Sequence, residues 1–470
     1  MTSIDKDVIE AFRSTLRGPL LLPDDPGYDQ ARSIWNAMID RRPALIVRCA
    51  GVADVMASVN FAREQELLLA VRGGGHNIAG NAVCDGGLML DMSLMKSAWI
   101  DPEARIGYVE AGATLGDFDH EAQAFGLATP LGINSTTGVA GLTLGGGFGW
   151  LSRKHGMSVD NLIAAEVVTA DGQRLWVSAH KHPELFWAIR GGGGNFGVVT
   201  LFEFALHPVG PAVLTGLLVF PFEQAKQVLS RYRDFVETMP EELSVWAVLR
   251  KAPPLPFLAP EMHGKEVVIL ALCYAGDIED GQRAIAPLRS FGQPCGQHSG
   301  VQPYSAWQKT FDPLLAPGAR NYWKSHNFSA LNDAAIDTVI RYAGKLPGPQ
   351  CEIFLGLIGG QTCRPAPDAT AYANRDALYV MNVHTRWDDP AEDKTCIAWA
   401  REFFDAAAPY ASGSVYVNFL TEDEGGRIAA AYGPNYQRLV QAKNRYDPQN
   451  LFRQNQNIKP DFNLIFEARP

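Results

Sequence analysis

The chain has few cysteines, and they follow no pattern. Its seven cysteines among 470 residues are widely spaced, at positions 49, 84, 273, 295, 351, 363 and 396, and form no Cys-x-x-Cys pair. An odd, scattered set is typical of reduced thiols, so we expect a cytoplasmic protein without a disulfide framework. The ten histidines form no His-Glu-x-x-His or comparable spacing, which predicts no metal site.

Long apolar runs and an excess of basic residues are also missing. No stretch approaches the roughly 20 apolar residues that span a bilayer, and the first residues lack the basic-then-apolar order of a signal peptide. We therefore expect no membrane partner. Lys and Arg number 41 against 51 Asp and Glu, which gives a net charge of −10. This balance argues against a nucleic-acid partner, because binding to phosphates depends on basic residues.

What is present is a globular composition that is rich in glycine. Hydrophobic residues make up 47% and charged residues 20%, which excludes a disordered chain. The length exceeds one ordinary hydrophobic core, so we expect more than one folding unit. Many of the 45 glycines gather in three loops, at residues 72–77, 132–149 and 190–197.

The first predicted domain, residues 1–206, alternates short strands and helices around these loops. Residues 163–177 predict a hairpin about the Asp171-Gly172 turn. Strands are expected at 44–47, 67–71, 87–91, 106–110 and 198–205, and helices at 52–65, 115–125 and 183–189. The predicted fold class is α+β.

Residues 207–411 predict a second domain, which is an antiparallel sheet backed by helices. Its strands are expected at 213–220, 267–274, 352–357 and 378–383, and its helices at 223–238 and 334–343. Residues 412–470 change character again, with a strand at 414–419, a helix at 432–443 and an amide-rich loop at 447–457. We expect this last segment to return to the first domain.

The glycine loops predict a large ligand that carries phosphate. A backbone without Cβ atoms can approach a pyrophosphate and offer it N–H groups. The series Gly192-x-Gly194-x-x-Gly197 matches the glycine spacing of the dinucleotide-binding fingerprint but not its structural context. That fingerprint needs a strand before it and a helix after it, and here the predicted order is the reverse.

The loop Arg72-Gly73-Gly74-Gly75-His76-Asn77 carries a family resemblance. Residues 40–206 resemble the two-part FAD-binding domain of the vanillyl-alcohol oxidase and p-cresol methylhydroxylase type. With Tyr416-Val417-Asn418 and residues 450–457, nearly the whole chain resembles the berberine-bridge-enzyme-like branch. This resemblance implies bound FAD, whose 8α-methyl group is attached covalently to the histidine at position 76.

One departure from the family pattern concerns the number of covalent bonds to FAD. Many relatives hold FAD a second time, through a cysteine in a Gly-x-Cys-x-x-x-Gly stretch. Here that stretch is residues 132–138, and Asn134 stands at the cysteine position. No cysteine lies between Cys84 and Cys273, so we expect FAD to be held through His76 only, as in the singly attached 6-hydroxynicotine oxidases.

The resemblance also implies noncovalent FAD contacts. Residues of the 134–149 tract would line the pyrophosphate and ribityl chain, and residues 195–199 would lie beside the adenosine. Asn455 and Asn457 either contact the flavin or cap a terminal loop. The expected contacts are Arg72, Gly73, Gly74, Gly75, Asn77, Asn134, Ser135, Thr136, Thr137, Gly138, Gly141, Leu142, Gly145, Gly146, Gly149, Asn195, Gly197, Val199, Asn455 and Asn457.

The family chemistry needs a group that takes a substrate proton while hydride leaves for the flavin. Tyr416, in the family's Tyr-x-Asn pattern, is the first candidate, but a phenol titrates near ~10 and would need a nearby cation. His384 is the second, because an imidazole titrates near ~6.5. Asn382 shares a strand face with His384 and can orient a hydroxyl but cannot act as a base.

Together these features predict an FAD-dependent oxidase of an alcohol, sugar or alkaloid-like substrate, with dioxygen as its second substrate. Thr137 stands where the family gates oxygen and is smaller than Leu or Ile. A dehydrogenase with another electron acceptor, or a flavin-binding protein without turnover, remain alternatives. Four aromatic residues belong either to the pocket or to the core: Trp246, Tyr322, Trp323 and Tyr379.

Overall fold

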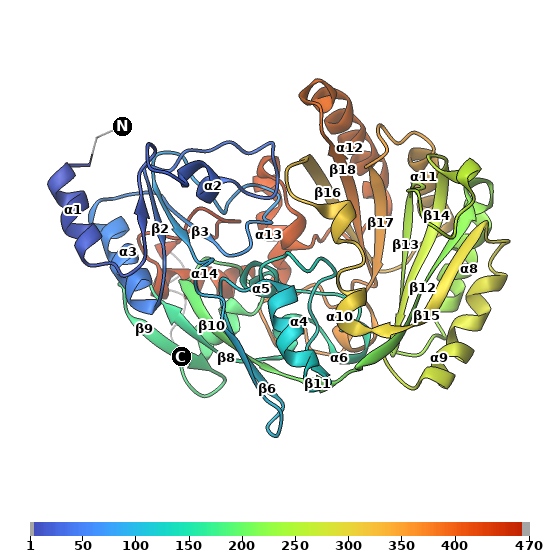
Figure 1. Ribbon diagram of the computed structural model, residues 1–470, viewed down its shortest axis with the longest axis horizontal. Helices are drawn as coiled ribbons and strands as arrows, with labels where there is room; N and C mark the ends of the chain where they lie inside the picture. The colour runs from blue at the N-terminus through green and yellow to red at the C-terminus, as the bar shows by residue number, and fades with distance from the viewer. Residues whose placement is uncertain (1–3, 463–470) are drawn as a thin grey trace.

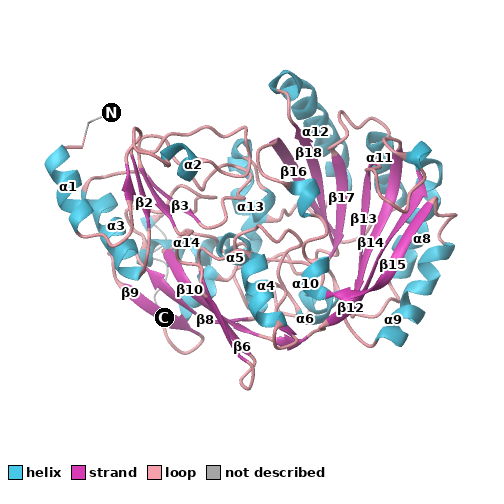
Figure 2. Ribbon diagram, viewed as in Figure 1, coloured by secondary structure: helices cyan, strands magenta, loops and turns pink. Residues whose placement is uncertain are grey.

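The structure is a computed structural model that describes residues 4–462. It consists of two units that lie side by side (Figure 1). The N-terminal unit contains two small sheets and a separate pair of short strands, and the other unit is built on one large sheet with helices on its outer face (Figure 2). The predicted α+β class is therefore confirmed. Among the described residues, no helix combines the length and apolarity needed to cross a membrane.

The two larger sheets of the N-terminal unit differ in type, and two short strands, Leu127–Ala128 and His207–Pro208, form a third, antiparallel pair. In the first, ordered β1-β2-β4-β3, strands β2, β4 and β3 are parallel. The second, ordered β5-β6-β10-β8-β9, is antiparallel, and β8 with β9 forms the predicted hairpin. The strands are β1 (Leu20–Leu21), β2 (Leu45–Arg48), β3 (Leu69–Arg72), β4 (Leu88–Asp91), β5 (Ala98–Asp101), β6 (Ile106–Glu110), β7 (Leu127–Ala128), β8 (Leu162–Val168), β9 (Arg174–Ser178), β10 (Val198–Ala205) and β11 (His207–Pro208).

The large sheet is antiparallel throughout, in the order β15-β12-β14-β13-β17-β18-β16. Its strands are β12 (Ala212–Pro221), β13 (Leu243–Lys251), β14 (Glu266–Tyr274), β15 (Gly296–Pro303), β16 (Arg320–Phe328), β17 (Glu352–Leu357) and β18 (Tyr379–Trp387). The sequence did not predict β13, β15 or β16. β13 and β16 are buried almost throughout, so neither alternates between polar and apolar residues, and β15 is an exposed edge.

Helices cover the large sheet and fill the N-terminal unit. The longer helices of the sheet unit pack on its outer face, away from the N-terminal unit, whereas the short helix Tyr304–Trp307 lies next to the N-terminal unit (Figure 1). The helices are α1 (Lys6–Ser14), α2 (Tyr28–Arg32), α3 (Val52–Glu64), α4 (Leu115–Gln123), α5 (Val139–Leu144), α6 (Ser152–His155), α7 (Pro183–Ile189), α8 (Ala225–Val236), α9 (Ile278–Ile285), α10 (Tyr304–Trp307), α11 (Asp333–Ala343), α12 (Asp393–Ala407), α13 (Ile428–Tyr432) and α14 (Tyr436–Tyr446).

The C-terminal segment returns to the N-terminal unit, where α13 and α14 lie among the first strands and helices (Figure 1). Two predictions for this segment are wrong. Residues 414–419 form no strand, because they bond through side chains to the residues around α5, and Val417–Phe419 is a 3-10 turn. The helix predicted at 432–443 is interrupted at Gly433-Pro434, since proline lacks the N–H that a continuous helix needs.

Candidate active site

A cavity of about 360 Å³ lies between the glycine loops of the N-terminal unit and the inner face of the large sheet. Residues from all three segments of the chain line it, including His76 from the first loop, His384 from β18 and Tyr416 from the C-terminal segment. The site therefore exists only when the two units are packed together.

The floor of the cavity is a close contact between two glycine loops. A Cβ atom on Gly74 would lie 2.3 Å from the backbone nitrogen of Gly138, so a side chain at either position would separate the loops. Gly75 has a φ of +73°, in the left-handed region that glycine adopts freely. Both loops line the cavity. A bare backbone of this kind can approach the phosphates of a nucleotide closely.

His76 stands at the end of the first loop, between two neighbours. Its ring stacks on Trp35 with the centroids 5.2 Å apart, and its Nε2 lies 3.0 Å from the Thr136 Oγ1. Burial among these groups lowers the pKa of His76 to about 4, because the charged ring would lose its water. The imidazole is therefore neutral at neutral pH.

The opposite wall is a row of side chains that the strand register aligns across the sheet. Arg250 on β13 pairs with Glu352 on β17, Glu352 pairs with His384 on β18, and His384 pairs with Trp323 on β16. The Arg250 Nη1 donates to Glu352 Oε2 at 2.7 Å, and His384 Nδ1 lies 3.1 Å from Glu352 Oε1. Burial alone would raise the pKa of Glu352, but Arg250 and His384 lower it to about 2.

Three polar atoms on this wall are buried and have no hydrogen-bond partner among the described residues. They are His384 Nε2, Asn382 Oδ1 and Trp323 Nε1, and all three residues line the cavity. Buried polar atoms are costly when they are left unpaired, so this wall is suited to a ligand that carries both hydrogen-bond donors and acceptors. Aromatic rings surround them: Trp246, Phe148, Phe354 and Phe419.

Tyr416 is buried on the C-terminal side of the cavity. Its hydroxyl accepts hydrogen bonds from the Gly147 N–H and from Asn418 Nδ2, each at 3.0 Å. Burial raises the pKa of Tyr416 to about 12, and these two bonds offset only part of the rise. The phenol therefore keeps its proton at neutral pH.

Comparison with known proteins identifies the family. Residues 43–178 match the FAD binding domain family, and residues 415–459 match the family described as berberine and berberine like. An FAD-linked oxidoreductase of Dictyostelium discoideum is 34% identical over 458 residues, which covers 96% of this chain and 97% of that protein. This chain belongs to the berberine-like FAD-linked oxidoreductases.

Two further relatives extend this comparison. (R)-6-hydroxynicotine oxidase of Paenarthrobacter nicotinovorans is 31% identical over 463 residues, covering 95% of this chain and 98% of that protein. The crystal structure of 6-hydroxy-D-nicotine oxidase from Arthrobacter nicotinovorans has a TM-score of 0.86 at 29% identity, and the match covers 98% of this chain and all of that one. The predicted family and its fold are confirmed.

The cavity of this berberine-like oxidoreductase fits FAD, because the glycine floor suits its phosphates and the aromatic side chains of the lining suit its rings. Most of the predicted cofactor contacts line it. They are Gly73, Gly74, Gly75, His76, Asn77, Asn134, Thr137, Gly138, Gly141, Leu142, Asn195, Gly197, Val199 and Asn455. The Asn455 amide also caps a loop, since its Nδ2 donates to Gly194 O at 3.2 Å. Asn455 thus caps a loop and also lines the cavity.

The remaining predicted contacts do not line the cavity. They are Arg72, Ser135, Thr136, Gly145, Gly146, Gly149 and Asn457. Arg72 donates to the backbone oxygen of Ala31 at 2.5 Å, and the Ser135 N–H donates to Asp312 at 2.9 Å. A Cβ atom on Gly149 would lie 1.8 Å from the backbone oxygen of Leu131. The tract thus contains both lining and packing glycines, which sequence alone does not separate.

Several cavity residues of this oxidoreductase carry no signal in the sequence. Trp35 lies outside the predicted domain core, and Glu352 is a single acidic residue at the start of an apolar strand. Of the four aromatic residues left open, Trp246 and Trp323 line the cavity. Tyr322 is instead part of a polar cluster, and Tyr379 lies in the core of the sheet.

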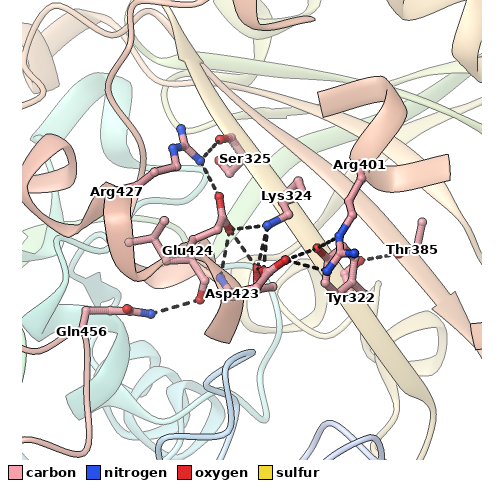
Figure 3. Close-up of polar contacts among 11 residues, drawn as sticks. Tyr322, Lys324, Ser325, Thr385, Arg401, Asp423, Glu424, Arg427 and Gln456 are labelled. Carbon is pink, nitrogen blue, oxygen red and sulfur yellow. Dashed lines mark hydrogen bonds and ion pairs between the residues drawn. The ribbon is translucent and has the colours of Figure 1, made fainter. Parts of the chain in front are cut away.

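That polar cluster joins the large sheet to the C-terminal segment (Figure 3). Lys324 on β16 donates to Asp423 at 2.8 Å, and the Tyr322 hydroxyl donates to the same carboxylate at 2.7 Å. Burial would raise the pKa of Asp423, but these donors hold it well below its usual range. Arg401 from α12 also donates to Asp423, at 2.9 Å. The cluster therefore holds the C-terminal segment, which also carries Tyr416, against the large sheet.

Proposed function

We propose that this oxidoreductase removes a hydride from a carbon that bears a hydroxyl or amino group, in a small substrate that contains a ring. FAD, when bound, would accept the hydride and pass the electrons to dioxygen, which leaves as hydrogen peroxide. The observation that carries this proposal is the pair Glu352 and His384 on one wall of the cavity whose floor is the glycine loops, with Arg250 next to Glu352 in the same row.

His384 takes the substrate's O–H or N–H proton. Glu352 accepts the Nδ1 proton of His384, which leaves the lone pair on Nε2, a buried nitrogen of this cavity-lining residue that has no partner among the described residues. The same carboxylate stabilises the imidazolium once the proton has moved. Arg250 keeps Glu352 ionised, so the carboxylate does not compete for the proton.

Tyr416 and Asn382 orient the substrate. The raised pKa of Tyr416 disfavours the tyrosinate base that the family pattern suggested. Its hydroxyl accepts two hydrogen bonds and still has its own proton to donate. Asn382 Oδ1 is a free acceptor two residues from His384 on the same strand face. Together they can hold the reacting C–H bond toward the flavin.

The electron acceptor is dioxygen. Thr137 lines the cavity and leaves more room there than Leu or Ile would. The relative named (R)-6-hydroxynicotine oxidase, and the solved structure named for the same activity, support an oxidase over a dehydrogenase. FAD is attached through His76 alone, because the described cysteines do not line the cavity and Asn134 does.

The substrate carries an aromatic or other apolar ring. Trp246, Trp323, Phe354 and Phe419 form most of the wall around the unpartnered polar atoms of His384, Asn382 and Trp323. A sugar would need more polar partners than this wall offers. A hydroxylated pyridine that carries an amine, as in the relative named 6-hydroxynicotine oxidase, has both a ring for the aromatic wall and polar groups for the unpartnered atoms.

The test is a substrate screen on the purified flavoprotein, with cyclic amines, aromatic alcohols and monosaccharides. Anaerobic bleaching of the flavin by a ring-bearing amine or alcohol, followed by recolouring and peroxide release in air, is the expected result. Bleaching without reoxidation in air would indicate a dehydrogenase. No bleaching by any class would support a flavin-binding protein without turnover, and bleaching only by sugars would refute the proposed substrate class.

A further inference from the structure

The loop that replaces the family's second FAD attachment makes a direct contact with His76. We propose that Asn134 and Thr136 hold His76 as the tautomer protonated at Nε2, so that its bond to FAD forms at Nδ1. This inference rests on the proposed attachment of FAD to His76. Neither residue needs to touch the cofactor for this role, so both are positioning residues.

The first step concerns the orientation of the Asn134 amide. Its Oδ1 lies 3.0 Å from the backbone N–H of Thr136 and 2.7 Å from the Thr136 hydroxyl. A backbone N–H can only donate, so the atom that faces it must be the amide oxygen and not the nitrogen. Because this oxygen can only accept, the Thr136 hydroxyl must donate its single proton to it.

The second step follows at the histidine. Thr136 Oγ1 lies 3.0 Å from His76 Nε2. Since the hydroxyl proton is already donated to Asn134, this contact is a hydrogen bond only if Nε2 carries the proton and Oγ1 accepts it. His76 is neutral, as its lowered pKa indicates, so the ring has one N–H. The lone pair then lies on Nδ1, and stacking on Trp35 holds the plane of the ring.

The attachment can be written so that atoms and electrons balance. One C–H bond of the FAD 8α-methyl breaks, and its proton leaves. His76 Nδ1 forms a bond to that carbon, and the electron pair enters the flavin, which is reduced. The Nε2 proton leaves to water at Thr136, whose side chain is exposed. Dioxygen then reoxidises the flavin and takes two electrons and two protons as hydrogen peroxide. The mass of the protein therefore increases by the mass of FAD minus that of two hydrogen atoms.

Asn134 thus has a use at the position where relatives hold cysteine. It is buried and lines the cavity, so a thiol there would reach the ligand. The amide instead accepts two hydrogen bonds from Thr136, which a thiol cannot do with comparable strength. At this position the chain therefore has an amide that assists the bond between His76 and FAD, in place of a cysteine that would form a second covalent bond.

The test uses the full-length protein, incubated with FAD in air, with the mass of the intact chain followed over time. Thr136→Val removes the hydroxyl and keeps the shape, and we expect attachment to slow about tenfold, the effect of losing one hydrogen bond. Thr136→Ser keeps the hydroxyl and should attach at the wild-type rate. Ser135→Ala is the matched control, because the Ser135 hydroxyl bonds to Asp312 and not to His76.

Two measurements separate this inference from the proposed attachment. Flavin absorbance after native desalting must be equal in Thr136→Val and wild type, which shows that folding and FAD binding are intact. NMR of the isolated flavin peptide should show the bond at Nδ1. A wild-type bond at Nε2, or equal rates in Thr136→Val and wild type, overturns the tautomer inference alone. A wild-type protein that never gains mass overturns the attachment as well.

Discussion

The charged row on the large sheet makes a quantitative prediction for Glu352→Gln. The substitution keeps the shape of the side chain and removes its charge. Glu352 lies 3.1 Å from His384 Nδ1 and 2.7 Å from Arg250, so the variant loses the ionic partner of the imidazolium. A hydrogen bond to a charged group contributes about 1.5–3 kcal/mol, which corresponds to a loss of about 10- to 100-fold in the rate of flavin reduction.

The amide adds a second effect in the same direction. It can turn its NH2 group toward His384, in which case Nδ1 accepts and the proton moves to Nε2. That tautomer has no lone pair facing the substrate. The rate loss should therefore lie toward the upper end of the range. Flavin content should stay at the wild-type level, because Glu352 lies on the substrate wall and not among the glycine loops.

Anaerobic stopped-flow reduction by an accepted substrate measures this loss. The control is Asp393→Asn, which removes a carboxylate from another ion pair on the same sheet, that of Arg320, outside the cavity. We expect it to lower stability and leave the reduction rate unchanged. Wild-type reduction in Glu352→Gln, together with wild-type reduction in His384→Ala, would refute the proposed base.

Acid stability provides an independent readout of the same carboxylate. The pKa of Glu352 is lowered from 4.5 to about 2, so the ionised group stabilises the fold fully above its unfolded-state pKa. That contribution, about 3 kcal/mol, is lost as the pH falls from about 4.5 toward 2. The unfolding free energy of Glu352→Gln should lack this loss between those pH values.

Four further variants test other parts of the site. Tyr416→Phe should slow flavin reduction by about tenfold or less, the contribution of one hydrogen bond, and a larger loss than in His384→Ala would return the base role to the tyrosine. Thr137→Leu should slow reoxidation by dioxygen but not reduction, and equal reoxidation traces would exclude an oxygen gate there. His76→Ala should release its flavin on acid precipitation, whereas wild type stays yellow. Asp119 is neutral in the fold because burial raises its pKa to about 7, so wild-type stability should fall as the pH rises from about 4 to 7, by up to about 4 kcal/mol. Melting curves of Asp119→Asn should lack that fall.

The glycine floor could be predicted from sequence because its geometry is local. Gly74, Gly75 and Gly138 occupy positions where a Cβ atom would clash or where φ is positive, and only glycine tolerates them. The loop that ends in His76 could therefore be assigned before any tertiary contact was known.

The substrate wall could not be predicted, because strand register assembles it. Arg250, Glu352 and His384 come from three strands that are far apart in sequence, and they meet only because their strands pair in one register. β13 and β16 are buried on both faces and lack the alternation that marks a strand. The base role of Tyr416 was expected from a family pattern, which carries no information on whether a cation lies nearby.

The cavity has a consequence for synthesis of the protein. Its walls extend in sequence from Trp35 to Gln456, about 420 residues, which a ribosome takes roughly 20–80 s to translate at common rates. The loop with His76 emerges early, but the C-terminal residues that complete the cavity emerge last. Cofactor capture must therefore follow release of the chain, and until then the apolar sheet face is open to chaperones and to aggregation. Cells starved of riboflavin should accumulate this protein in a form that proteases cleave readily.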